Sequence, residues 1–312
     1  MAALPELAEP PTRAPSPGEI CVIANARSGT NARDAEAIER AFRVFGDAAV
    51  LREWTPGEDL RETVQEAIDA GARTVVAAGG DGTAMAAAQA LLGTDVALAV
   101  LPLGTFNYFA RGLGLPEDPE EAARAILAGR RHQISVGMVG EQVFLNNASL
   151  GVYPAILKER ETVYKRWGRR RLMAHWSVLK TFLRFQRPMK MRITADGVSR
   201  NVRAPLLFVA RSSYQLDRFG LAGTEAIKDD RFAVLIGRAT SRGKLFKITW
   251  RLVTGTMQEG RDYDMIAARH LTVETAKPRT LVAFDGEKSR ERSPFTVRIA
   301  DRPLTIIRPD RS

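Results

Sequence analysis

The first third of the chain alternates short β-rich runs with helical patterns, and this alternation limits the fold more than any other feature. Strands are predicted over Ile20 to Ala24, Ala49 to Trp54, Thr74 to Ala78 and Val96 to Leu101. Apolar residues at helical spacing occupy the intervals between these strands. Such alternation predicts an α/β domain with a doubly wound parallel sheet, covered by helices on both faces.

The pattern changes after about residue 134, where short alternating runs separated by turns take over. The predicted strands are Val136 to Met138, Val143 to Asn147, Lys190 to Thr194, Val202 to Ala210, Phe232 to Ile236, Leu271 to Glu274, Leu281 to Phe284 and Phe295 to Ile299. Helical stretches interrupt them at about 172–185 and 243–254. This half predicts a second, mainly antiparallel β domain.

The N-terminal segment, the cysteine count and the length of the apolar runs limit which class of protein this chain can belong to. Met1 to Glu19 is rich in proline and has no apolar core segment, so residues 1–18 are expected to form a disordered leader. Cys21 is the only cysteine, which excludes an internal disulfide and fits a reducing compartment. No apolar run approaches the roughly 18 residues that span a bilayer. A cytoplasmic protein is therefore expected.

The chain is basic, and its excess charge is concentrated. Lys and Arg number 46 against 36 Asp and Glu, which gives +10 over 312 residues. Between Lys158 and Arg203 there are fourteen basic residues and three acids. Such a segment favours an anionic partner, either nucleic acid, anionic membrane lipid or a phosphorylated small molecule. No nucleic-acid motif is present, so nucleic acid is not expected as a partner.

The basic segment contains an apolar helical stripe with Lys180, Arg184 and Arg187 beside it. Two interpretations are open: a helix that lies on an anionic membrane, or a helix packed inside the protein. The fourteen cations favour peripheral membrane contact through Lys165 to Arg171 and Lys180 to Arg187.

The string Gly79-Gly80-Asp81-Gly82-Thr83 follows a predicted buried strand and precedes a helix. Glycines let the backbone approach an anion, the helix N-terminus attracts phosphate, and Asp81 could hold a metal-bound water. A tight structural turn is the alternative. Two further polar loops, Asn25 to Gly29 and Pro102 to Asn107, also follow strands. Three such loops at the carboxyl edge of one sheet indicate a nucleotide site.

Asp285-Gly286-Glu287 follows the predicted strand Leu281 to Phe284. Two carboxylates on one tight turn could offer a base for an attacking hydroxyl and a second group to hold it or a metal. The tripeptide alone also fits a plain hairpin turn.

Four motifs in order resemble the bacterial lipid kinases built on the diacylglycerol kinase catalytic domain. They are Gly79 to Thr83, Pro102 to Arg111, Phe144 to Gly151 and Phe284 to Glu287. The resemblance implies an ATP-binding α/β domain over 19–134, with 303–312 as a candidate for its last piece, and a β-sandwich lipid-substrate domain over 135–302. It further implies an active site in the interdomain cleft, where magnesium-dependent transfer of the ATP γ-phosphate to a lipid hydroxyl occurs.

Roles carry over by position. The nucleotide would be held by Asn25, Ser28, Gly29, Thr55, Gly79, Gly80, Asp81, Gly82, Thr83, Gly104, Thr105 and Asn107. Glu287 would accept the hydroxyl proton, supported by Asp285. The resemblance also implies a structural divalent-ion site at Asp229 with the carbonyls of Ala226 and Arg231. Asp230 replaces the glycine usual after that aspartate.

Other departures from the family pattern concern magnesium. Met85 and Ala86 replace an Asn-Glu pair, and Ser135 replaces an aspartate. Because Asp81, Asp285 and Glu287 are all retained, an active kinase is favoured. Diacylglycerol is the expected acceptor, giving phosphatidic acid at the inner face of the membrane, and a homodimer is one possible assembly. The alternatives are a soluble NAD-kinase-like nucleotide kinase and a noncatalytic lipid binder.

Overall fold

The computed structural model describes residues 15–25, 32–55, 58–151, 188–239 and 241–309. By its contacts the chain separates into two compact units. The α/β unit draws on residues 3–136 and 300–312, and the β unit on 137–299. No described helix is both long enough and apolar enough to cross a bilayer.

The α/β unit is built on one six-stranded sheet with the order β2-β1-β3-β4-β18-β5. Its strands are β1 (Ile20–Asn25), β2 (Ala49–Trp54), β3 (Thr74–Gly79), β4 (Ala97–Pro102), β5 (Arg130–Ile134) and β18 (Leu304–Arg308). All neighbours pair in parallel except β5, which runs antiparallel to β18. β4 is buried along its whole length, as a central strand covered on both faces requires.

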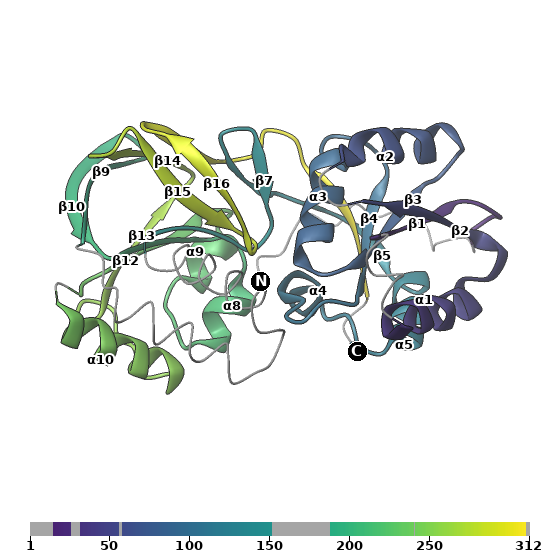
Figure 1. Cartoon of the computed structure of the whole chain (residues 1–312), viewed down its shortest axis with the longest axis horizontal. Coiled ribbons are helices and arrows are strands. Elements are labelled where there is room, and N and C mark those ends of the chain that lie inside the picture. The colour runs from purple at the N-terminus through teal and green to yellow at the C-terminus, as the bar shows by residue number, and fades with distance from the viewer. Residues whose placement is uncertain (1–14, 26–31, 56–57, 152–187, 240, 310–312) are drawn as a thin grey trace. The chain divides into compact units, whose positions relative to one another are not determined.

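Helices cover both faces of this sheet, so the predicted doubly wound α/β fold is confirmed (Figure 1). α1 (Ala32–Phe45) packs with α5 (Pro119–Leu127) on one face, and α2 (Leu60–Asp69) packs with α3 (Asp81–Leu91) on the other. Asp118 caps α5 and also receives Arg40 of α1 at 2.6 Å. A short helix, α4 (Tyr108–Leu113), follows β4, and a 3₁₀ turn, η1 (Gly46–Ala48), precedes β2.

The strand β18 comes from the far end of the chain and lies between β4 and β5. Leu304 and Ile306 are fully buried, and Ile306 pairs with Leu98 of β4. The last described residues thus complete the sheet that the first 136 residues begin.

The β unit is a sandwich of two six-stranded sheets, as the second half of the sequence predicted. One sheet has the order β10-β9-β14-β17-β6-β7 and the other β13-β12-β11-β8-β15-β16, with antiparallel pairing throughout. The strands are β6 (Gly137–Val139), β7 (Gln142–Phe144), β8 (Asn147–Gly151), β9 (Met189–Ala195), β10 (Val198–Ala204), β11 (Leu206–Ala210), β12 (Phe232–Gly237), β13 (Tyr263–Ala268), β14 (His270–Thr275), β15 (Arg279–Phe284), β16 (Glu287–Arg292) and β17 (Phe295–Ile299). The helices are α8 (Ser213–Arg218), α9 (Thr224–Lys228) and α10 (Arg242–Val253).

Two predicted strands of the β unit are wrong in their boundaries. The run Val143 to Asn147 is not one strand, because it belongs to β7 and β8 with a break at residues 145–146. The run Val202 to Ala210 is divided into β10 and β11, which lie in different sheets. Pro205 stands at that division, and proline has no N–H to donate to a strand ladder.

Candidate active site

The strand order of the α/β unit reverses between β1 and β3, since the chain adds β2 on one side of β1 and then β3 on the other. Ligands of open α/β sheets bind at the carboxyl edge beside such a reversal. β3 ends at Gly79, and the glycine-rich turn follows at this edge. The predicted turn therefore lies where this fold offers a crevice.

The turn after β3 packs directly on the loop after β4 through two glycines. A Cβ placed on Gly104 would lie 2.5 Å from the Cα of Gly80 and 2.6 Å from Oδ1 of Asn107. The N–H of Leu103 also donates to the carbonyl of Gly79 at 2.9 Å. Only residues without side chains allow this approach of two backbones.

Asp81 fastens the same two loops together. Its Oδ2 accepts from the N–H of Tyr108 at 3.1 Å, and its Oδ1 accepts from the N–H of Phe109 at 2.9 Å. These donors belong to the first turn of α4, where backbone N–H groups lack intrahelical partners. The carboxylate thus has a structural contact in addition to any role toward a metal.

Asn107 fixes the shape of the second loop. Its Oδ1 accepts from the N–H of Gly104 and its Nδ2 donates to the carbonyl of Gly104, both at 3.0 Å. Its backbone is left-handed, with φ 50°, a conformation that asparagine tolerates better than most residues. Gly104 and Thr105 remain exposed beside it.

The predicted nucleotide residues separate into three groups. Gly79 to Thr83, Gly104, Thr105 and Asn107 come together in the two contacting loops. Thr55 follows β2 at the same edge, but β1 lies between β2 and β3. Asn25 ends β1, while Ser28 and Gly29 lie outside the described residues.

The two loops fit a bound phosphate chain. The N-cap of α3 is Gly80, and no side chain caps the first turn of this eleven-residue helix. Backbone N–H groups at a helix N-terminus, bordered by glycines, suit an anion. Met85, in α3, belongs to the hydrophobic core, and 6% of its surface is exposed. This departure from the family pattern therefore contributes packing rather than a polar ligand.

In the β unit, Asp285 sits in a two-residue turn between β15 and β16 and is 8% exposed. Asp285 and Gly286 both have positive φ, 46° and 93°, as the tight hairpin turn of type I′ requires. The Asp285 carboxylate accepts from three consecutive N–H groups, at Leu145, at Asn146 (2.9 Å) and at Asn147 (3.0 Å). These bonds divert the backbone between β7 and β8.

Glu287 is the first residue of β16, pairs with Phe284 and is exposed. The hairpin interpretation and the acidic-site interpretation are therefore compatible. The turn is a hairpin, its first acid is buried for structure, and its second acid is left accessible.

The residues predicted for a structural cation lie at the C-terminal end of α9, with Ala226 in the helix and Asp229 and Arg231 directly after it. The N–H of Arg231 donates to the carbonyl of Ala226 at 2.8 Å, and Asp229 is exposed. Asp230 takes the left-handed conformation, φ 55°, that its glycine counterpart would adopt. The described residues contain no cluster of three acidic, histidine or cysteine side chains suited to a metal. An ion here would thus depend on Asp229, carbonyl groups and water.

Sequence reasoning missed a buried polar cluster beside Asp285. Asn147 donates from Nδ2 to Oε1 of Gln215 at 2.8 Å, and both side chains are buried. Oδ1 of Asn147 and Oγ of Ser149 are buried without a hydrogen bond among the described residues. The asparagines of the Phe144 to Gly151 motif were the available signal, whereas nothing in the sequence singled out Gln215.

The segments predicted to contact a membrane, Lys165 to Arg171 and Lys180 to Arg187, lie outside the described residues.

Comparison with known proteins covers nearly the whole chain. The sequence model of the diacylglycerol kinase catalytic domain matches residues 19–139. That of the YegS C-terminal NAD kinase beta sandwich-like domain matches residues 151–308, which is more than half of the chain.

Similar proteins are named as lipid kinases. A protein of Chromohalobacter salexigens named "Probable lipid kinase YegS-like" is 37% identical over 153 residues, 48% of this chain and 49% of that protein. A protein of the same name from Pseudomonas putida is 44% identical over 100 residues, 31% and 33% of the two chains. The matched region thus spans half or less of these relatives.

A crystal structure described as a diacylglycerol kinase from Bacillus anthracis str. Sterne has a TM-score of 0.68 to this chain. It is 20% identical and covers 94% of this chain and 98% of its own, which shows a shared fold. The two sequence matches show that the chain belongs to the lipid kinase family with a diacylglycerol kinase catalytic domain.

Proposed function

We propose that this chain transfers the γ-phosphoryl group of ATP to the hydroxyl of a membrane lipid, with diacylglycerol as the acceptor and phosphatidic acid as the product. The main support for the proposal is the contact between the two glycine-bearing loops after β3 and β4, at the carboxyl edge of the sheet. Asp81 holds these loops together by hydrogen bonds. Kinase relatives named for lipid substrates support the choice of acceptor class.

The nucleotide would be bound by Gly79 to Thr83, Gly104, Thr105 and Asn107, with Asn25, Ser28, Gly29 and Thr55 as further contacts. When bound, ATP supplies the phosphoryl group and Mg²⁺ neutralises its charge. Asp81 would orient a metal-bound water beside the amides of α3. Positioning and charge neutralisation account for most of the catalysis of phosphoryl transfer, so rigid loops are the main requirement.

Glu287 would accept the proton of the attacking hydroxyl. Its exposure leaves the carboxylate accessible to substrate, and the buried Asp285 turn holds the start of β16 in place. Asp285 would therefore act as a positioning residue. Asp229, with the carbonyls of Ala226 and Arg231, would hold a structural cation in the same unit.

The reaction would take place at the cytoplasmic face of the membrane, to which the protein would bind peripherally. A lipid acceptor requires such contact, and the basic segment 158–203 provides charge for an anionic bilayer.

Turnover tests this proposal. The protein is incubated with labelled ATP, magnesium and mixed micelles of diacylglycerol, and a labelled lipid product is expected. Glu287→Gln should reduce its rate by about 100-fold or more, the usual range for loss of a positioned base. Glu259→Gln removes a charge from another exposed glutamate of the β unit and should leave the rate unchanged.

Other outcomes identify the alternatives. Phosphorylation of a soluble nucleoside acceptor, with no lipid product, would favour an NAD-kinase-like enzyme. Lipid binding without turnover on a panel of diacylglycerol, monoacylglycerol, sphingoid bases, ceramide and phosphatidylglycerol would favour a noncatalytic relative.

A further inference from the structure

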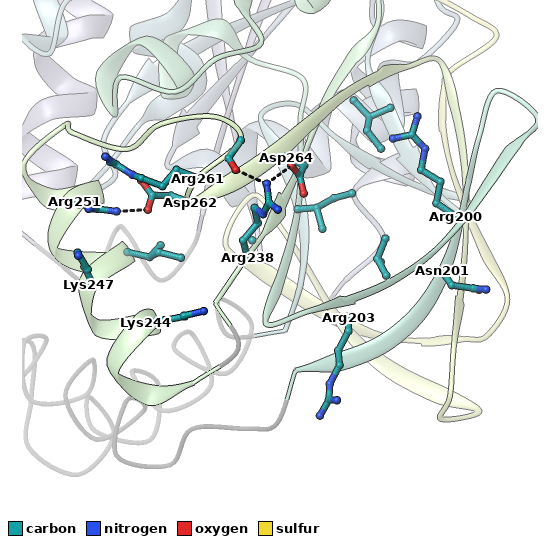
Figure 2. A pocket seen from close by; sticks show the side chains of 16 residues that line it. Arg200, Asn201, Arg203, Arg238, Lys244, Lys247, Arg251, Arg261, Asp262 and Asp264 are labelled. Atoms are coloured by element: carbon teal, nitrogen blue, oxygen red, sulfur yellow. Dashed lines mark hydrogen bonds and ion pairs between the residues drawn. The ribbon is translucent and has the colours of Figure 1, made fainter.

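A pocket of about 820 Å³ opens in the β unit between β10, α10 and the strands β12 and β13. Seven cationic and two acidic side chains line it. Arg200 and Arg203 come from β10, and Lys244 and Lys247 come from α10. Arg200 and Arg203 are three residues apart on the edge strand β10, and their side chains point in opposite directions (Figure 2). Ile236, Ile248 and Ile266 contribute apolar surface.

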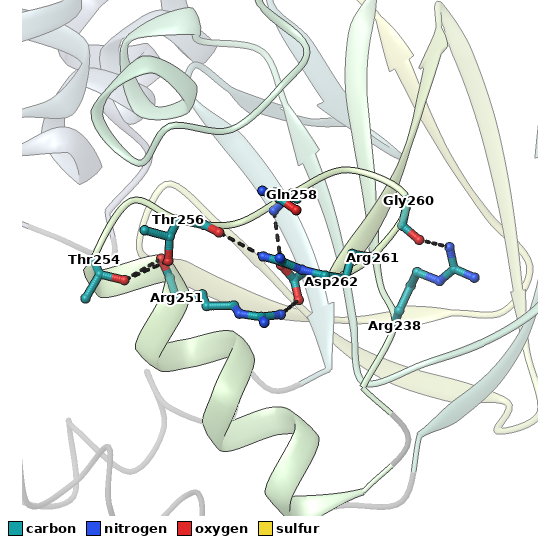
Figure 3. Close-up of polar contacts among 8 residues, drawn as sticks. All are labelled: Arg238, Arg251, Thr254, Thr256, Gln258, Gly260, Arg261 and Asp262. Carbon is teal, nitrogen blue, oxygen red and sulfur yellow. Dashed lines mark hydrogen bonds and ion pairs between the residues drawn. The ribbon is translucent and has the colours of Figure 1, made fainter.

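The two acids of the pocket, Asp262 and Asp264, pair with three of its cations, which are Arg238, Arg251 and Arg261. Asp262 is 2% exposed and receives both Arg251, from α10, and Arg261, the latter at 2.8 Å (Figure 3). Asp264 pairs with Arg238 at 3.2 Å. The contact between Arg251 and Asp262 anchors α10 to the segment before β13, so the helix has a fixed place in the unit.

Four cations of the pocket are left without an acidic partner among the described residues: Arg200, Arg203, Lys244 and Lys247. All four are exposed. A second hollow shares Arg203, and its described lining contains five further cations and no acid. The positive charge therefore extends over a surface rather than surrounding one small ion.

α10 exposes two aromatic side chains among its lysines, where a solvated helix would have polar residues. Leu245 is 6% exposed and attaches the helix to the unit. Phe246 and Trp250, one turn apart, are 62% and 63% exposed. At 3.6 residues per turn, Lys247 lies next to this pair on the helix surface.

We propose that Arg200, Arg203, Lys244, Phe246, Lys247 and Trp250, here named the α10 face, form a docking surface for a bilayer containing anionic phospholipid. The cations contact lipid phosphates, and the two aromatic side chains enter the interface, where tryptophan is favoured. The inference deepens the proposed lipid kinase function by stating which surface of the β unit faces the substrate-bearing membrane.

Two other roles for these residues, protection of an edge strand and binding of nucleic acid, account for the surface less well. Charged residues protect an edge strand from pairing with another chain, which accounts for Arg200 and Arg203 on β10 but not for the lysines of α10. Single-stranded nucleic acid also binds cations beside exposed aromatic side chains. The sequence contains no nucleic-acid motif, however, and the chain belongs to a lipid kinase family, so a bilayer is the occupant that we propose.

The test uses the full chain and vesicles of phosphatidylcholine with or without phosphatidylglycerol. Sedimentation should show binding to the anionic vesicles only. Both Lys244→Glu with Lys247→Glu and Phe246→Ser with Trp250→Ser should weaken that binding by about tenfold or more. Arg43→Glu with Arg61→Glu reverses two exposed cations of the α/β unit and should bind as the unaltered chain does.

Three readouts make the outcome decisive. Unchanged thermal unfolding shows that the variants fold, and unchanged turnover of a water-soluble short-chain diacylglycerol shows that only docking is lost. Failure of the kinase proposal would instead abolish turnover while vesicle binding and its dependence on the α10 face persist. Equal vesicle binding by all variants overturns the inference. So does a change in oligomeric state on Phe246→Ser with Trp250→Ser without loss of vesicle binding, or preferential binding of RNA.

Discussion

Asp81 and Asp285 both direct their carboxylates at backbone N–H groups of a neighbouring loop. Asp81 receives two of them at the start of α4, and Asp285 receives three between β7 and β8. Asp81 therefore fixes the loop that carries Asn107, and Asp285 fixes the break within the Phe144 to Gly151 motif. The exposed Glu287 makes no such contact among the described residues, so the turn combines a structural carboxylate with the one that we propose as the base.

That separation is testable by stability. Asp285→Ala leaves three N–H groups without their acceptor in a buried place and should lower the free energy of unfolding by about 2–4 kcal/mol. Glu287→Gln should change it by less than about 0.5 kcal/mol, because the side chain is exposed. Urea unfolding of the two variants measures both values. Equal stabilities would contradict the structural role of Asp285.

The contact of Gly80 with Gly104 makes a second prediction at single residues. Gly104→Ala places a methyl group against the Gly80 backbone and should cost about 1–3 kcal/mol of stability while weakening ATP binding. Gly243→Ala in α10 meets no atom within 4 Å and should instead stabilise by about 0.5–1 kcal/mol. Thermal unfolding and calorimetric titration with ATP test the pair, and normal ATP affinity in Gly104→Ala would contradict the packed-loop geometry.

At the scale of elements, α10 depends on one buried acid in the segment that leads into β13. Burial by itself raises the pKa of Asp262, but hydrogen bonds from Arg261, from the N–H of Gln258 and from Arg251 outweigh it. The pKa of Asp262 therefore lies below its ordinary value of 3.8. The contact stabilises the fold above the unfolded-state pKa, and that stability is lost as the pH falls through the lower folded-state pKa.

Asp262→Asn should accordingly reduce stability at pH 7 by about 3 kcal/mol, since two arginines lose their buried partner. The difference from the unaltered chain should shrink as the pH falls below about 4, because Asp262 itself then becomes protonated. Asp264→Asn, which breaks an exposed pair with Arg238, should cost at most about 1 kcal/mol. Urea unfolding at several pH values measures the difference in the free energy of unfolding between Asp262→Asn and the unaltered chain. A difference that does not change with pH would contradict the role of the Asp262 carboxylate.

Element boundaries show what local patterns do and do not determine. β2 was predicted to its end residues, because in the sequence Gly46 precedes the run Ala49 to Trp54 and Pro56-Gly57 follows it, and such residues punctuate local structure. The Val143 to Asn147 run failed, since its break is caused by an acid about 140 positions away in the sequence. Strand propensity reports on neighbours in the chain and contains no information about such a distant acceptor.

The molecule has two hydrophobic cores, one in each unit. The core of the α/β unit is formed by two separate segments of the chain, one before and one after the β unit. β17 ends at Ile299 in the β unit, yet β18 begins at Leu304 in the sheet of the α/β unit. Because each unit buries its own apolar residues, each should unfold in its own transition. Residues close in the sequence should then affect different transitions.

Ile306→Ala in β18 should lower the stability of the α/β unit by about 3 kcal/mol, and Val297→Ala in β17 should lower that of the β unit by about 2 kcal/mol. Both side chains are fully buried. Calorimetry with ATP identifies the transition of the α/β unit, because a bound ligand raises it. A single transition that both substitutions shift equally would contradict two independent cores.

The sequence by itself determined the alternation of strands and helices, the change to antiparallel β structure and the motifs of the proposed site, because period, glycines and acids are local properties. Only the tertiary structure decided that Asp81 joins two loops, that Asp285 is buried while Glu287 is exposed, and that α10 presents aromatic side chains beside cations with no acidic partner in the described part of the chain. Each of these depends on which distant segments pack together, and packing places residues in contact that are far apart in the chain.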